Sequence, residues 1–451
     1  PATKGGFSAK ASVHVKLVFV VDYTQDLATY KKTLWDTTGK NKRNTAGQSG
    51  IALSEGTLSE MDTSFAEKTS AWNGGNSGKR ARAVQRSTTQ ETVLQEGILE
   101  SSLPMQAEIN GKRVMVFQSY EGSRTILNSS LLKYSVYENG VWSEPEAVWD
   151  NGCADLYADM KVVDGQLVCV WQKEKAEIGG DVGSDSGGVL KNFARNSEIC
   201  FALFDEQSGT FQNPSYVTDN DACDMMPRIC ENSRDIILSW VRNDEADLMQ
   251  GSGKNTIYTV KWNGNSFEPE TALVQSPGTV NDYVVYQDAE GTQTVFNGTS
   301  GDLSAVFDRE GQVVEGLTDL IMFSDEGKVS SLHYADGKIA VVSGGTLYSY
   351  DPLTKEAESA LAGDSAFGSE VQYCSNGEKS GCIWSIYDEE TGMGSIQASM
   401  KTEEGYSEPV VLYEKQGMIW RYLSPVLDSD GNWKIVANGQ NVEEGLNALA
   451  A

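Results

Sequence analysis

Histidine is scarce in this sequence, and its cysteines form no metal-binding pattern. His14 and His333 are the two histidines among 451 residues, and no Cys-x-x-Cys pair occurs. Structural zinc sites take their ligands chiefly from cysteine and histidine, and the Ser-His-Asp triad needs a histidine as its base. The sequence therefore argues against both. We expect no cofactor, and the one ion left open is calcium in the glycine- and aspartate-rich loop 179–188, which lacks EF-hand spacing.

Basic residues are few in this sequence, and it has no long apolar segment. The chain has 36 Lys and Arg against 64 Asp and Glu, which gives a formal net charge of −28. Nucleic-acid binders carry a basic footprint, and anionic membranes attract basic segments, so we expect neither partner. The longest apolar run, residues 17–21, is far shorter than the ~20 residues of a membrane span. No signal peptide is visible, and because the sequence begins at Pro1 we expect a processed chain or a piece of a longer one.

The cysteine count is odd and low. Seven cysteines in 451 residues are too few for a disulfide scaffold. Cys169 and Cys200 lie in apolar, strand-like runs, where buried free thiols are expected. Cys374 and Cys382 flank a hairpin-like segment, so two interpretations stay open there: free thiols or a cross-hairpin disulfide.

What the sequence does contain is a repeat. A turn with glycine followed by a short apolar strand, as in Asp164-Gly-Gln-Leu-Val-Cys-Val-Trp171, recurs along the chain. The Gly supplies the positive φ of a tight hairpin turn. Seven copies end between Phe117 and Ala437, at a mean spacing of about 53 residues, near the ~40–50 of propeller blades. The copies end at Phe117, Trp171, Trp240, Phe296, Val342, Trp384 and Ala437.

A second motif places an aromatic residue shortly before proline, as in Trp142-Ser-Glu-Pro145. Proline is tolerated on edge strands, so this motif indicates the outer strand of each unit and the first motif an inner one. With the alternating runs between them, each unit has about four strands. We therefore predict an all-β fold, a seven-bladed β-propeller of four-stranded antiparallel blades. Short helices are expected only at residues 24–34 and 59–66.

The two ends of the repeat region suggest how the ring closes. We expect residues 1–84 to form a small N-terminal extension that contains β structure and ends in a linker, and one interpretation makes it the end of a truncated upstream domain. The propeller is predicted over 85–451. The last unit lacks an outer strand, and residues 92–99 are predicted to supply it, which would remove an exposed edge.

The repeated turn–strand–aromatic unit and the Trp142-Ser-Glu-Pro145 segment resemble propeller segments of large secreted surface proteins of Gram-positive, gut-type bacteria. More loosely, they are similar to sialidase-type propellers. The resemblance covers roughly residues 90–440 and implies an extracellular or cell-wall location. It carries over no functional residue, because Asp428-Ser-Asp-Gly-Asn-Trp433 has too short a spacing for a sialidase Asp-box.

Candidate ligand-binding residues lie in the loops that enter each first strand or join second and third strands, since these loops share one face. Aromatic rings beside carboxylates and arginine suit sugar or peptide ligands. The alternative is that these side chains make structural contacts of the ring. The candidates are Tyr157, Asp159, Asp224, Arg242, Asp244, Trp420, Arg421 and Tyr422.

From these observations we expect an extracellular, non-catalytic binding or display module of a bacterial surface protein. Its ligand would be carbohydrate or protein, and the chain would be a monomeric unit of something larger. The alternative is a sialidase-like glycoside hydrolase or lyase on the loop face, for which the fold gives only an analogy. A third hypothesis is a protein scaffold whose acidic surface selects basic partners.

Overall fold

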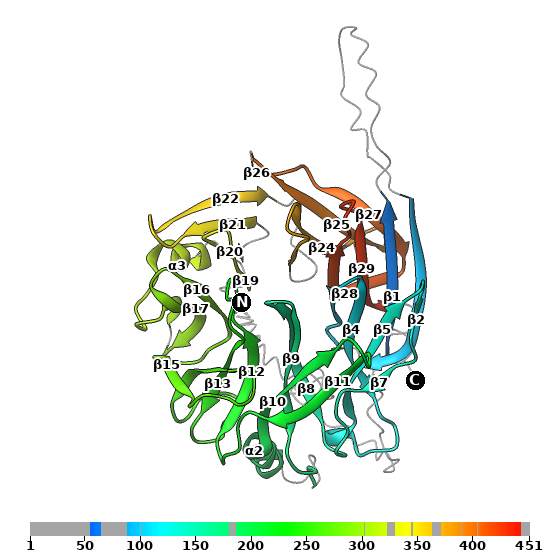
Figure 1. The fold of residues 1–451 in the computed structure, drawn as a ribbon. Helices are drawn as coiled ribbons and strands as arrows, with labels where there is room; N and C mark the ends of the chain where they lie inside the picture. Colours follow the sequence, from blue (N-terminus) through cyan, green and yellow to red (C-terminus); the bar gives the residue numbers. More distant parts are fainter. Residues whose placement is uncertain are drawn as a thin grey trace, which may run out of the picture.

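A computed structural model gives the structure of the chain. It describes residues 55–64, 88–99, 101–179, 186–301, 303–322, 330–343, 346–362, 371–388, 390–403 and 405–442. Strand makes up 62% and helix 6%, which confirms the all-β prediction. Sheets are arranged around a central opening, which confirms the β-propeller (Figure 1).

Five separate blades make up most of the ring. Each runs outward from its first strand, and neighbouring strands are antiparallel. The first two blades are β8 (Asp155–Val163), β9 (Gln166–Glu174), β10 (Ser197–Asp205) and β11 (Thr210–Tyr216), then β12 (Cys223–Ile229), β13 (Ile237–Asn243), β14 (Asn255–Lys261) and β15 (Thr271–Gln275). The third is β16 (Asp282–Asp288), β17 (Gly291–Ser300) and β18 (Leu303–Asp308), and the fourth is β19 (Ser330–Ala335), β20 (Lys338–Ser343), β21 (Thr346–Asp351) and β22 (Glu356–Ala362). The fifth is β23 (Gln372–Ser375), β24 (Ser380–Asp388), β25 (Met393–Thr402), β26 (Gly405–Tyr406) and β27 (Val410–Gln416).

The remaining strands form one nine-stranded sheet, so the prediction of seven separate blades is wrong. The predicted units that end at Phe117 and Ala437 both lie in this sheet, where the pairing of Ile98 with Ser119 joins them. Sequence periodicity could not show this junction, because a single backbone pairing carries no pattern. The sheet contains β1 (Glu55–Ser64), β2 (Thr88–Leu99), β3 (Met105–Ile109), β4 (Lys112–Tyr120), β5 (Ser130–Glu138), β6 (Val141–Trp142), β7 (Glu146–Ala147), β28 (Met418–Leu427) and β29 (Trp433–Asn441).

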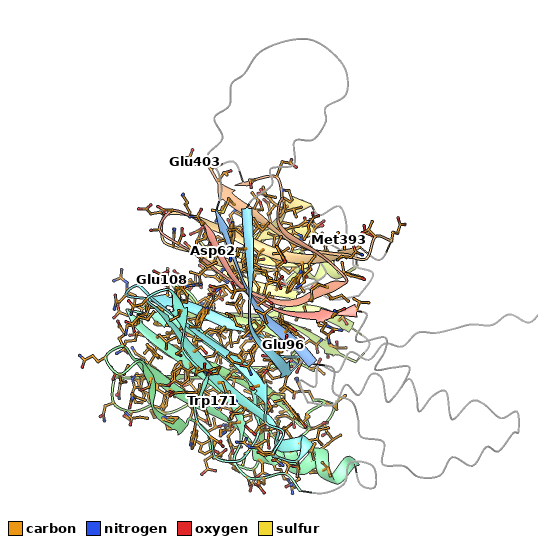
Figure 2. All side chains as sticks on the ribbon, turned by 90° about the vertical axis from the view of Figure 1, so that its right-hand side faces the viewer. Asp62, Glu96, Glu108, Trp171, Met393 and Glu403 are labelled. Carbon is orange, nitrogen blue, oxygen red and sulfur yellow. The ribbon has the colours of Figure 1, made fainter. Side chains whose placement is uncertain are left out.

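N-terminal strands meet the C-terminal ones in this sheet. β1 pairs with β29 on one side and with β2 on the other, so residues 55–64 belong to the ring and not to an N-terminal extension. The Asn438 amide of β29 reinforces the meeting by donating to Leu99 O at 3.0 Å. Lys415 of the neighbouring β23–β27 blade also reaches β2, with its Nζ 2.9 Å from Glu91. In Figure 2, β1 and β2, which carry Asp62 and Glu96, lie between the strands with Trp171 and those with Met393.

Three of the predicted glycine turns are two-residue hairpin turns. Asn110, Asp164 and Asp336 each adopt a positive φ and precede a glycine that does the same. Two successive positive φ values match the twist of the flanking strands and favour Asn-Gly and Asp-Gly. The turns at Asn110, Asp164 and Asp336 join the first and second strands of their units.

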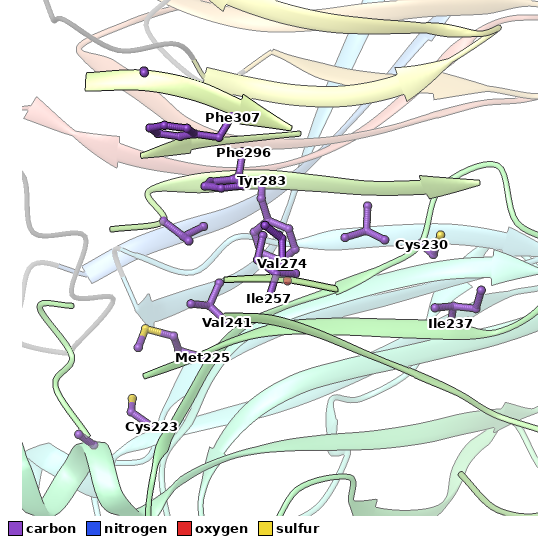
Figure 3. Close-up of a cluster of buried hydrophobic side chains, with 14 of the residues drawn as sticks. Cys223, Met225, Cys230, Ile237, Val241, Ile257, Val274, Tyr283, Phe296 and Phe307 are labelled. Carbon is purple, nitrogen blue, oxygen red and sulfur yellow. The ribbon is translucent and has the colours of Figure 1, made fainter. Parts of the chain in front are cut away.

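Blades bury apolar side chains against each other. Trp171, Trp240 and Trp384 are buried, as their recurrence at strand ends predicts. Figure 3 shows one such layer, in which Val241 and Ile257 of the β12–β15 blade meet Tyr283 and Phe296 of the next. One four-stranded sheet has two apolar faces, and the ring covers both with neighbours.

Helices are few among the described residues: α2 (Ser186–Asn196), α3 (Glu315–Met322) and the short 3₁₀ helix η1 (Ile126–Asn128). The helix predicted at 59–66 is wrong where the chain is described, because residues 59–64 belong to β1 and pair on both sides. The helix predicted at 24–34 and most of loop 179–188 lie outside the described residues.

All seven cysteines are free thiols, so the cross-hairpin disulfide is excluded. Cys374 pairs with Gly381, and Cys382 pairs with Tyr373. Successive residues of a strand point to opposite faces of the sheet, and therefore the two thiols face away from each other. Cys169 and Cys200 are buried, as predicted.

Candidate functional site

Two of the predicted loop-face residues, Asp224 and Arg242, lie side by side on β12 and β13. The Arg242 Nε and Nη2 atoms donate to the Asp224 carboxylate at 2.7 and 3.0 Å, and the Trp240 indole donates at 2.9 Å. Arg242 also binds Glu270 through Nη1 and Nη2, at 2.6 and 3.0 Å. Asp224 is fully buried, and its oxygens are occupied by donors of its own blade.

The preceding blade repeats this arrangement with residues that sequence reasoning missed. The buried Asp155 accepts the Trp171 indole N–H at 3.0 Å and the Lys173 ammonium at 2.7 Å. In both blades the Trp lies 16 residues after the Asp, and the cationic residue lies 18 residues after the Asp. This Asp–Trp–cation spacing was the available signal. Its recurrence points to a device that fastens the first strand of a blade to the second.

The other predicted residues lie apart from this pair. Tyr157 occupies a bulge of β8 and packs against an apolar cluster with Leu156 and Phe193. Asp159 accepts the Ile229 backbone N–H at 2.8 Å, which ties β8 to β12. Asp244 accepts the Lys254 N–H at 2.6 Å in the loop between β13 and β14.

The C-terminal trio lies on β28. Trp420 is buried in an apolar core, while Arg421 occupies a bulge and donates to Gln440 at 2.5 Å. Tyr422, next to it, is half-buried. Two cavities among the described residues, of about 800 and 450 Å³, are lined by none of the eight candidates.

A cavity of about 800 Å³ lies instead at the opposite end of the first strands. It extends from the central opening into the space between the β19–β22 blade and the β23–β27 blade. We call it the interblade cleft. The hairpin turns at Asn110, Asp336 and Asn376 border it, whereas the loop-face candidates Asp224, Arg242 and Asp244 lie at the other ends of their strands.

Small side chains open the cleft. Ala340 of β20 stands where Val114 and Val168 stand in their own repeats, three residues after the turn glycine. Those valines are buried against the next blade, but Ala340 is only half-buried and lines the cleft. Ser349, the cross-strand partner of Ala340, and Ser380 of the facing blade line it too. Large apolar residues such as Leu347 and Trp384 close the remaining part of this interface.

The central end of the cleft is built by residues from four blades. The Glu231 carboxylate receives Lys161 Nζ at 2.8 Å from β8 and lies 3.0 Å from His333 Nδ1 on β19. It also accepts the Tyr334 backbone N–H. The His333 ring stacks on the Tyr373 ring of β23, with centroids 4.5 Å apart and planes 10° from parallel. This cluster fixes the positions of Lys161, His333 and Tyr373, all of which line the cleft.

Electrostatics at this cluster favour the ionised carboxylate. Burial alone would raise the pKa of Glu231, but Lys161 and His333 hold that pKa well below its usual range. For Lys161, burial opposes the charged form, and the carboxylates of Asp159 and Glu231 nevertheless raise its pKa. Burial also raises the pKa of the Tyr373 phenol far above its usual value, and its hydroxyl has no hydrogen-bond partner among the described residues.

Metal-ligand geometry is not found in this part of the chain: within the described residues no group of three or more His, Cys, Asp or Glu could hold a metal ion. No helix among them is long and apolar enough to cross a membrane. The interblade cleft presents hydroxyl, aromatic and charged side chains to a ligand.

Comparisons with known proteins give likenesses of fold only. No protein-family model and no curated protein matches the chain. Among solved structures, a Mycobacterium tuberculosis puromycin-hydrolyzing peptidase matches with a TM-score of 0.42 and 12% identity, over 72% of this chain and 49% of that one. Trypanosoma rangeli sialidase in complex with 2,3-difluorosialic acid matches with a TM-score of 0.40 and 8% identity, over 80% and 59%. The chain thus spans about half the length of these proteins, and the propeller assignment rests on its own sheets.

Proposed function

We propose that this chain is an extracellular, non-catalytic binding module whose ligand occupies the interblade cleft. The observation that supports the proposal is the cleft itself, a cavity of about 800 Å³ where a propeller would normally bury apolar side chains. Small-molecule and glycan sites are typically cavities of roughly 300–1,000 Å³ with a few fixed polar groups. Ala340, Ser349 and Ser380 keep the space open, and the Glu231 cluster holds the polar wall in place.

The binding role also fits the contacts of the acidic residues near the opposite face. Asp224 and Asp155 are buried and hold Trp and cation partners of their own blades. A general acid or base must reach the reacting atoms of a substrate. These two carboxylates serve the fold, and this is why binding ranks above glycoside hydrolysis in the proposal.

The test is to fill the cleft and measure binding to an array of oligosaccharides and extended peptides. Ala340→Trp should abolish capture of every array member that the natural chain binds, and leave the melting temperature within a few degrees. Ala272→Trp is the matched control, since Ala272 is exposed on β15 in another blade. Capture that survives Ala340→Trp would refute the cleft as the ligand site.

A further inference from the structure

We infer that the interblade cleft is built for an uncharged oligosaccharide. This inference rests on the proposed binding function and specifies its ligand. It follows from three properties of the lining: its charge balance, its free hydroxyl groups with adjacent rings, and the use of sheet faces as walls.

Charges at the cleft cancel. Lys161 is paired with Glu231 at 2.8 Å, and Lys401 is paired with Asp336. The remaining lining charges are Lys338 and Glu108, one of each sign, and neither forms an ion pair with another described residue. A strongly anionic ligand would also approach a chain of net charge −28, whose field repels it. The lining therefore favours a ligand without net charge.

Hydroxyl groups on both walls are available to a ligand. Ser349 and Ser380 line the cleft, and their side chains make no hydrogen bond with another described residue. The same holds for the hydroxyl of Tyr406. Each hydroxyl can donate and accept, as the hydroxyls of a sugar do. By contrast, the Asn376 amide already donates to Asp428 O at 2.7 Å and its oxygen accepts backbone N–H groups of its own turn.

Aromatic rings lie beside these hydroxyls. The stacked His333 and Tyr373 rings line the central end of the cleft, and Tyr406 lines its outer part. A ring offers a flat apolar surface with a polar tip, which suits ligands that alternate C–H faces with hydroxyl groups. Oligosaccharides have this pattern along their whole length.

The walls of the cleft distinguish a sugar from an extended peptide. Peptides that bind to sheets as added strands need an open edge with unpaired N–H and C=O groups. Between the two blades the walls are sheet faces: Ala340 and Ser349 are cross-strand partners on inner strands of one blade, and Gly381 of the other blade pairs with Cys374 on one side and Met400 on the other. Their main-chain groups are engaged in the ladders, so recognition depends on side chains.

The experiment is a calorimetric titration of the full chain with three matched probe sets of two to four units: neutral hexose and N-acetylhexosamine oligosaccharides, the same sugars bearing carboxylate or sulfate, and uncharged peptides. At least one neutral oligosaccharide should bind saturably. Tyr406→Ser should weaken that binding by about tenfold or more, and Ala272→Trp, outside the cleft, should leave it unchanged. Tyr406→Phe keeps the ring and checks folding, with a loss smaller than that of Tyr406→Ser.

Each contrary outcome has a distinct meaning. Preferential binding of the acidic sugars, lost in Lys338→Gln, would overturn the inference and leave the cleft as the ligand site. Binding of peptides alone, abolished by Ala340→Trp, would do the same. Neutral sugars that bind equally well to Ala340→Trp and Tyr406→Ser would overturn both the inference and the proposed function. No binding by any neutral sugar would overturn the inference.

Discussion

Breaking the buried Asp155–Lys173 pair should destabilise the chain far more than breaking an exposed ion pair. Both side chains are fully buried, and they lie 2.7 Å apart. At that distance their attraction is roughly 6 kcal/mol for an effective dielectric constant of about 20. In Lys173→Met the Asp155 carboxylate would keep the Trp171 and Leu132 N–H donors, at 3.0 and 2.9 Å, but would lose its counter-charge.

We therefore expect Lys173→Met to lower the free energy of unfolding by about 3–5 kcal/mol. The double variant Asp155→Asn/Lys173→Met should recover a large part of the loss, because no buried charge remains. Lys261→Met is the matched control: Lys261 and Asp235 form an exposed pair, and its loss should leave the free energy of unfolding nearly unchanged.

Urea unfolding at pH 7, followed by tryptophan fluorescence, measures all three variants. A loss below about 1 kcal/mol for Lys173→Met would refute the reasoning, since that is the range of exposed pairs. So would a double variant that is no more stable than the single one.

Three further predictions concern other parts of the ring. Glu174 is fully buried, and burial raises its pKa well above the usual value, so the folded chain holds a proton that the unfolded chain loses above about pH 4.5. Stability should therefore fall as pH rises. In thermal melts, Glu174→Gln should raise the free energy of unfolding by about 1–3 kcal/mol at pH 8 and leave it unchanged at pH 4. An equal increase at both pH values would contradict this. Arg113 binds Glu60 of β1 at 2.6 Å, so Arg113→Met should lower the free energy of unfolding by about 2–3 kcal/mol and speed amide hydrogen exchange in β1. Unchanged exchange would show that this ion pair does not hold β1 in the sheet. All seven thiols should react with a thiol reagent in denaturant. In the native state Cys374, the one that is not fully buried, should react first. A count of five reactive thiols in denaturant would reveal a disulfide.

Local features of this fold were readable from the sequence because they depend on neighbours in the chain. The Asn-Gly and Asp-Gly turns and the buried Trp171, Trp240 and Trp384 follow from turn chemistry and strand patterning. The number of separate blades was not readable, since the pairing of Ile98 with Ser119 joins two units through one contact. Strand pairing of residues 59–64 on both sides likewise overrode their helical pattern.

The candidate site was harder to predict from the sequence, for a physical reason. Lys161, Glu231 and His333 come from three blades and lie 70 and 102 residues apart in the chain, so no local spacing connects them. The alanine at position 340 is visible when the repeats are aligned with Val114 and Val168, but its meaning depends on which blade faces it. The loop-face residues Asp224 and Arg242 have the chemistry of a binding site, and the repeated Asp–Trp–cation spacing explains their pairing.

His333 provides the most direct test of ligand binding in the interblade cleft. It lines the cleft, and in a His14→Gln variant it is the sole histidine of the chain. Its ring resonances can then be followed by NMR while the neutral oligosaccharide set is titrated. The account predicts a saturable shift of the His333 resonances with the same affinity as the calorimetric titration. An unshifted His333 signal in a sample that calorimetry shows to be saturated would contradict it.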